Sequence, residues 1–123
     1  MESAPIFILE QNVRAHLLSA QVSSQEAAKA IASTDLCQQQ ADIYQAAVDF
    51  LKSSDKFSEK KFDDRGHPIS DLARSAKTWL DGVTSNSLKA AKHSLDVENH
   101  TAKALQYQDA VDTLKQMPAP NIP

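Results

Sequence analysis

The sequence predicts an all-α protein, a four-helix bundle of long amphipathic helices without strands, or a five-helix bundle if one helix is broken. Residues 6–65 contain neither glycine nor proline, whereas a sheet protein needs turn-forming residues every 8–12 positions. The same stretch is rich in Ala, Gln, Leu and Lys, which favour helix. Apolar residues recur at spacings of three and four, the period of an amphipathic helix.

The first predicted helix covers residues 5–20. Its apolar stripe consists of Ile6, Leu9, Val13, Leu17 and Ala20. Pro5 is compatible with a first helical turn. The spacing turns Ile6 and Leu9 inward and leaves Phe7 and Ile8 at the rim or in solvent.

A second helix is predicted over residues 23–53. Ser23 and Glu26 have the spacing of a capping box, which marks a helix start. The expected buried seam is Ala27, Ile31, Thr34, Cys37, Ala41, Tyr44, Val48 and Leu51. Thr34 could instead cap a new helix, so the sequence leaves open whether residues 23–53 form one helix or two.

Turn-forming residues then predict a loop over residues 54–68 and two further helices. The third helix begins at Ser70 and ends at Gly82, which serves as its C-cap. The last helix runs from Ser87 to Met117 and is ended by Pro118. Its expected buried residues are Leu88, Ala91, Leu95, Ala102, Leu105, Tyr107, Val111 and Leu114. We therefore predict a single helical domain over residues 1–117 and a proline-rich extended tail over 118–123.

The composition restricts the partners and the compartment. The net charge of −3, with acidic and basic residues interspersed, disfavours a nucleic-acid partner. No apolar run is long enough for a membrane span. The single cysteine, Cys37, allows no intrachain disulfide and occupies a predicted core position. We expect a cytoplasmic, intracellular protein unless a targeting segment has been removed.

One face of the last predicted helix carries a candidate metal-binding set. His93, Asp96 and His100 follow each other at i, i+3 and i+7. Three ligands from one straight helix suit a tetrahedral ion poorly. An exposed polar stripe is the better interpretation, and we predict no metal and no cofactor.

Two arginine–histidine pairs provide the alternative function. Arg14 with His16, and Arg65 with His67, resemble the pairings used by some small helical ribonucleases. Such a site needs the two side chains to converge as acid/base catalyst and phosphate clamp. The resemblance implies a small RNA- or nucleotide-processing enzyme.

A second resemblance concerns Trp79 and Gly82. The string Trp-Leu-Asp-Gly resembles the Trp-x-Gly turn of small secreted helical-hairpin proteins, but it is one residue longer. Trp79 is better interpreted as the main core anchor of the third helix.

The predicted function is a non-enzymatic helical protein–protein interaction module: an adaptor, an inhibitor-type binder or a small subunit of a larger complex. The reason for this prediction is the run of large apolar residues at positions 6–9. Phe7 and Ile8 are the predicted protein-binding residues, and the partner is another protein or a second copy. A loop carrying Phe57 and Phe62 is the alternative cover for them.

Overall fold

The structure is a computed structural model that describes residues 3–57 and 66–118. Of these residues 93% are helical and none lies in a strand, which confirms the all-α prediction. The elements are α1 (Ala4–Lys52), the short 3-10 helix η1 (Asp55–Phe57) and α2 (Pro68–Lys115). The prediction of four or five helices is wrong, because the described residues form two long helices.

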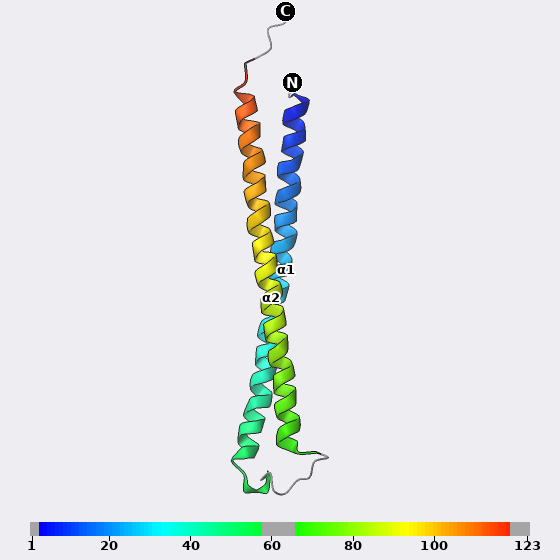
Figure 1. Cartoon of the computed structure of the whole chain (residues 1–123), viewed down its shortest axis with the longest axis vertical. Helices are drawn as coiled ribbons and strands as arrows, with labels where there is room; N and C mark the ends of the chain where they lie inside the picture. Colours follow the sequence, from blue (N-terminus) through cyan, green and yellow to red (C-terminus); the bar gives the residue numbers. More distant parts are fainter. Residues whose placement is uncertain (1–2, 58–65, 119–123) are drawn as a thin grey trace, which may run out of the picture. The chain divides into compact units, whose positions relative to one another are not determined.

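The chain divides into two compact units, each containing part of α1 and part of α2. Unit 1 comprises Met1–Ala27 and Ala91–Pro123, and unit 2 comprises Ala28–Ala90. In unit 1 the beginning of α1 lies antiparallel to the end of α2, and in unit 2 the end of α1 and the beginning of α2 form a helical hairpin (Figure 1). The expectation of a single domain over residues 1–117 stays a prediction.

Side-chain hydrogen bonds and a proline explain where the two long helices begin. The Ser3 Oγ accepts a hydrogen bond from the Ile6 N–H at 3.4 Å, which caps the start of α1. α2 begins earlier than the expected Ser70, because Pro68 occupies the first helical position and His67 Nδ1 accepts the Ile69 N–H at 3.1 Å. The tail lies outside the described residues, except for Pro118.

The expected breaks inside the helices do not occur, because the polar side chains bond to the helix that contains them. Thr34 Oγ1 donates to the Ala30 carbonyl at 2.8 Å, so Thr34 extends α1 and caps no new helix. Residues 23–53 therefore belong to one helix as far as Lys52, and Ser23 does not start it.

The segment between Gly82 and Ser87, which the sequence predicts to separate the third helix from the last, is also helical. Asn86 Nδ2 donates to the Gly82 carbonyl at 2.9 Å, and Gly82 does not have a positive φ. Trp79 and Gly82 therefore lie inside α2, and the resemblance to a Trp-x-Gly turn does not hold. Gly82 is no C-cap.

The helices pack through two heptad seams, stripes in which residues alternate at spacings of three and four. Every seam residue is buried or half-buried. The α1 seam is Ile6, Leu9, Val13, His16, Ala20, Ser23 and Ala27 in unit 1, then Ala30, Thr34, Cys37, Ala41, Tyr44, Val48 and Leu51 in unit 2. The α2 seam is Ile69, Leu72, Ala76, Trp79, Val83, Asn86 and Ala90 in unit 2, then His93, Val97, His100, Ala104, Tyr107, Val111 and Leu114 in unit 1.

The seams differ from the predicted ones at several large residues. Leu17 is 50% and Ile31 is 52% exposed, and their neighbours His16 and Ala30 occupy the seam. In α2 the expected core residues Leu88, Leu95 and Leu105 are 67%, 55% and 62% exposed. Ala91 and Ala102 are exposed too. Two packed helices bury only a narrow stripe, and small residues fill it well because they let the backbones approach.

Candidate protein-binding surface

The seam of unit 1 contains a histidine pair. His16 Nδ1 and His100 Nδ1 lie 3.0 Å apart, so one imidazole donates its proton to the other. The ring of Tyr107 stacks on His16, with 5.5 Å between ring centroids. These side chains form a polar layer in which the imidazole bond satisfies two groups that would otherwise be costly to bury.

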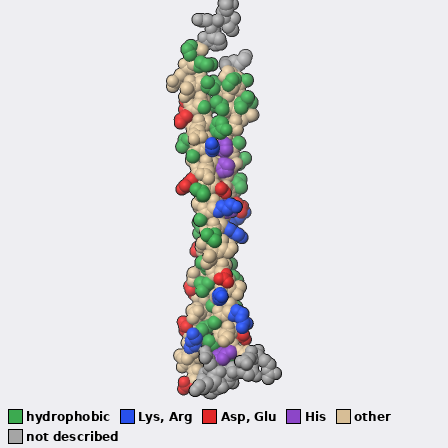
Figure 2. All heavy atoms as spheres, in the orientation of Figure 1, with side chains coloured by type: hydrophobic (Ala, Val, Ile, Leu, Met, Phe, Trp, Pro, Cys, Tyr) green, Lys and Arg blue, Asp and Glu red, His purple; other side chains and the backbone are tan. Residues whose placement is uncertain are grey.

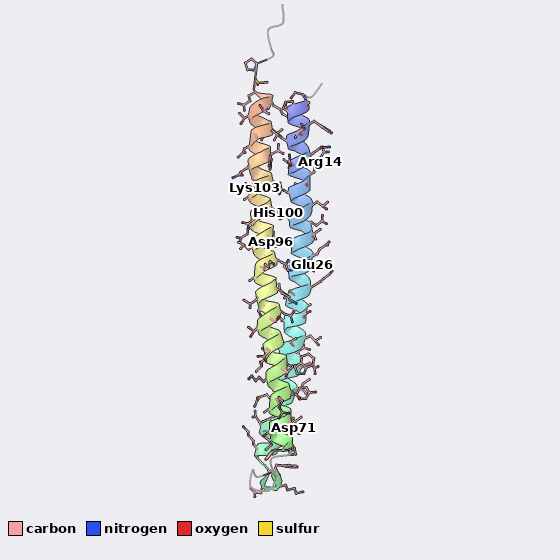
Figure 3. All side chains as sticks on the ribbon, turned by 45° about the vertical axis from the view of Figure 1, so that its right-hand side comes forward. Arg14, Glu26, Asp71, Asp96, His100 and Lys103 are labelled. Carbon is pink, nitrogen blue, oxygen red and sulfur yellow. The ribbon has the colours of Figure 1, made fainter. Side chains whose placement is uncertain are left out.

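The position of His16 separates it from its predicted catalytic partner. His16 lies on the seam, whereas Arg14 is exposed on α1 (Figure 3). In the second pair, Arg65 lies outside the described residues and His67 serves the start of α2. Arg14 and His16 therefore do not converge in the described residues, and the second arginine–histidine pair stays a prediction.

The candidate metal set is likewise divided. His93 Nδ1 lies 4.0 Å from a carboxylate oxygen of Asp96, while His100 bonds to His16 on the other helix. Within residues 3–57 and 66–118, no group of three or more His, Cys, Asp or Glu side chains is placed to hold a metal ion. His93 and His100 are seam residues, so the expected exposed polar stripe is wrong for them.

The seam of unit 2 has a polar layer of another kind. Cys37 Sγ lies 3.7 Å from Asn86 Nδ2, and a Cβ on Gly82 would lie 2.9 Å from that sulfur. Gly82 therefore makes room for Cys37. Cys37 is half-buried and occupies the core position that the sequence predicted.

The outward face of α1 carries a second heptad stripe, nearly opposite the seam. We call it the outer stripe. In unit 1 it consists of Ile8, Gln11, Ala15, Leu18, Val22 and Gln25, and in unit 2 of Lys29, Ala32, Leu36, Gln39, Ile43, Ala46 and Phe50. All of these residues are exposed. Its large members in unit 2 are 54% (Leu36), 60% (Ile43) and 77% (Phe50) exposed, and Lys29 is its single charged residue.

The equivalent face of α2 provides an internal comparison. Its outward positions in unit 2 are Asp71, Arg74, Thr78, Asp81, Ser85 and Leu88, and all are exposed. Charged and hydroxyl side chains dominate there, as on an ordinary solvated helix face. The outer stripe of α1 is therefore a property of that helix and does not follow from the helical pairing itself.

Apolar side chains are visible on the surface of each unit (Figure 2). Exposed large apolar residues scattered singly need no explanation, but a continuous row of them indicates an interaction surface. Leu36, Ile43 and Phe50 recur at every seventh residue, so they lie on one face of α1, with Gln39 and Ala46 between them.

The two predicted binding residues lie at the beginning of this helix. Phe7 is 50% and Ile8 is 56% exposed, while Ile6 is buried at 9%. Ile8 belongs to the outer stripe. Phe57 is half-buried in η1, and Phe62 lies outside the described residues, so the proposed loop cover stays a prediction.

Sequence reasoning missed most of the outer stripe because it assigned one apolar face to each helix. The signal was present as a second set of apolar residues at positions 22, 36, 43 and 50, offset from the seam. A helix with apolar residues on two faces can pack against one neighbouring element on each of those faces.

Comparisons with protein-family models, with curated proteins and with solved structures found no match. Among residues 3–57 and 66–118, neither long helix contains a stretch apolar enough to cross a membrane.

Proposed function

We propose that this chain is a protein–protein interaction module that presents the outer stripe of α1 to another helical protein surface. The proposal rests on one observation: Leu36, Ile43 and Phe50 form an exposed apolar row on one face of α1 in unit 2. Fully burying a side chain of this kind contributes about 1.5–3 kcal/mol, so covering the exposed parts of these three residues adds favourable free energy to binding.

The spacing defines what fits this row. Apolar residues seven apart, with alanine and glutamine between them, form the knobs and holes that accept another amphipathic helix. A partner that lies along this face therefore offers a helix with a heptad stripe of its own.

Site-specific photocrosslinking in the native cell tests this function. A benzophenone side chain in place of Gln39, an exposed polar member of the outer stripe, should crosslink the chain to a protein partner. The matched control places the same group at Ser85, an exposed residue on the outward face of α2 in the same unit. Crosslinked protein at position 39 and little at position 85 is the expected result.

The adduct at position 39 should also disappear when Ile43 is changed to lysine, because a charge on the row prevents its burial. Equal crosslinking at both positions, or none at position 39, would show that the outer stripe is ordinary solvated surface and would refute the proposed function.

A further inference from the structure

The histidine pair of unit 1 has room for one hydrogen between its two rings. His16 Nδ1 and His100 Nδ1 lie 3.0 Å apart, and the ring centroids lie 5.3 Å apart. The rings therefore meet end to end through these nitrogens. A hydrogen bond of this kind needs one nitrogen that carries a proton and one that offers a lone pair. The bond that joins the two helices at this layer thus depends on which nitrogens are protonated.

The number of protons that the pair can hold follows from this geometry. A neutral pair and a singly protonated pair both keep the hydrogen bond, because in each of them one Nδ1 still has its lone pair. In a doubly protonated pair both Nδ1 atoms carry hydrogen, so the bond is lost. Two positive charges would then face each other across 3.0 Å in a half-buried layer. The closed pair therefore holds one proton fewer than two solvated, fully protonated histidines.

Histidine is concentrated in the seam of unit 1. Three of the four histidines of the chain lie there, namely His16, His93 and His100. The seam residues of unit 2 that the structure describes include none. Histidine is the side chain that ordinarily gains or loses its proton between about pH 5 and pH 8. Mild acidification therefore acts on the seam of unit 1 more than on that of unit 2.

We propose that the His16–His100 pair is a pH-sensitive switch within unit 1. At neutral pH its hydrogen bond holds the beginning of α1 against the end of α2. At acidic pH the second proton requires the two rings to separate, and the seam of unit 1 opens with them. Unit 2 keeps its own seam closed. This role goes beyond the proposed function, because it needs no partner and does not involve the outer stripe.

The charged surroundings of the pair do not favour a second proton. The charged side chains within one turn of the pair are Arg14 on α1 and Asp96, Glu98 and Lys103 on α2. Their formal charges cancel. Asp96 is engaged elsewhere, because its carboxylate oxygen lies 4.0 Å from His93 Nδ1. Tyr107 stacks on His16, and Glu10 and His93 lie about two turns from the pair along their helices.

Proton linkage fixes the direction of the effect. Stability rises with pH wherever the unfolded chain binds more protons than the folded one. Below about pH 6 the two histidines of an opened chain both become protonated, whereas the closed pair holds at most one proton. The equilibrium constant for closing unit 1 should therefore fall by up to about tenfold for each pH unit of acidification. Above about pH 7 the pair is neutral in both states and adds no pH dependence.

Amide hydrogen exchange of the purified chain between pH 7 and pH 5, corrected for the intrinsic pH dependence of exchange, tests the switch. Protection of residues 13–20 in unit 1 should fall by up to about tenfold per pH unit below about pH 6. Protection of residues 41–48 in unit 2 should stay constant. Opening of both units together would show general acid unfolding and would overturn the proposal, as would constant protection of residues 13–20.

Two variants assign the effect to the pair. The double variant His16→Leu/His100→Leu removes both imidazoles and should make the protection of residues 13–20 independent of pH in this range. His93→Leu is the matched control, because it removes another seam histidine of unit 1 and leaves the pair intact. It should keep the acid response. Loss of protection in the double variant equal to that of the wild-type chain would overturn the proposal.

NMR of the imidazole nitrogens provides a test that needs no variant, should the double variant fail to form its helices by circular dichroism. One Nδ1 of the pair should remain without a proton for as long as the amides of residues 13–20 are protected. Both should become protonated together with the loss of that protection. A wild-type chain in which both rings are fully protonated while these amides stay protected would overturn the switch.

Discussion

Gly82 lies against Cys37 in unit 2, at a point where a Cβ on the glycine would be 2.9 Å from the cysteine sulfur. The glycine is in mid-helix, where alanine would otherwise be favoured by about 1 kcal/mol. Cys37 and Gly82 thus form a complementary pair on the seam, with the missing side chain of one making room for the other.

The first prediction is a reversal of sign at Gly82. In the Cys37→Ala background the sulfur is gone, so Gly82→Ala should stabilise the chain by up to about 1 kcal/mol through helix propensity. In the wild-type background the new methyl group displaces the sulfur, and the same change should be neutral or destabilising. Urea unfolding of the four chains measures the coupling, which we expect to be about 1 kcal/mol. Equal effects in both backgrounds would contradict the close contact.

The all-α class was predictable from composition, but the number of helices was not. Ser23 and Thr34 are residue types that begin helices, and they predicted one helix start at Ser23 and a possible second one at Thr34. In the structure, Thr34 and Asn86 bond to carbonyls four residues earlier in their own helix. The sequence contains no signal for which of these hydrogen bonds forms. Packing of the seam residues against the other helix determines which of these hydrogen bonds forms, and therefore whether the helix continues.

Continuity of α1 is the subject of the second prediction. If a helix began at Ser23, the amides of Ser24 and Gln25 would have no intrahelical acceptor and would exchange rapidly. Since α1 continues through this segment, both amides should exchange as slowly as those one turn on either side. Hydrogen exchange followed by NMR measures this, and rapid exchange confined to residues 24–25 would restore the helix boundary.

The position of the seam was also hard to predict, for a physical reason. Ile31 is larger and more apolar than Ala30, so a search for apolar periodicity selects Ile31. The structure buries Ala30 and leaves Ile31 at 52% exposure. In a pair of helices the close approach of backbones favours the small residue on the seam, and large residues then remain for other surfaces.

The third prediction concerns the histidine pair of unit 1. His100→Leu leaves His16 Nδ1 without its partner in the seam, which should cost about 1–3 kcal/mol. His16→Leu should have a similar effect. The double variant replaces both polar groups by apolar ones and should recover most of the loss. Chemical unfolding tests this, and losses that simply add in the double variant would show that the imidazoles do not interact.

Trp79 gives the fourth prediction. It lies on the seam of unit 2 but is half-buried, so part of its side chain stays in contact with solvent. Trp79→Ala should destabilise the chain by about 2 kcal/mol or more, below the 3–5 kcal/mol of a fully buried aromatic. The denaturant midpoint measures it. A loss under about 1 kcal/mol would make Trp79 a surface residue available to a partner.

The last prediction compares two neighbours at the beginning of α1. Ile6 is buried at 9% and Phe7 is 50% exposed, so the same substitution should act on different properties. Ile6→Glu places a carboxylate in the seam of unit 1 and should lower the melting temperature, at a cost of several kcal/mol. Phe7→Glu should change the free energy of unfolding by about 0.5 kcal/mol or less, as at other surface positions. If Phe7 contributes to the binding surface together with Ile8, Phe7→Glu should nevertheless weaken partner binding or self-association. Thermal unfolding by circular dichroism and sedimentation of both variants separate the two effects. A Phe7→Glu chain that melts as early as Ile6→Glu would place Phe7 in the core and remove it from the interface.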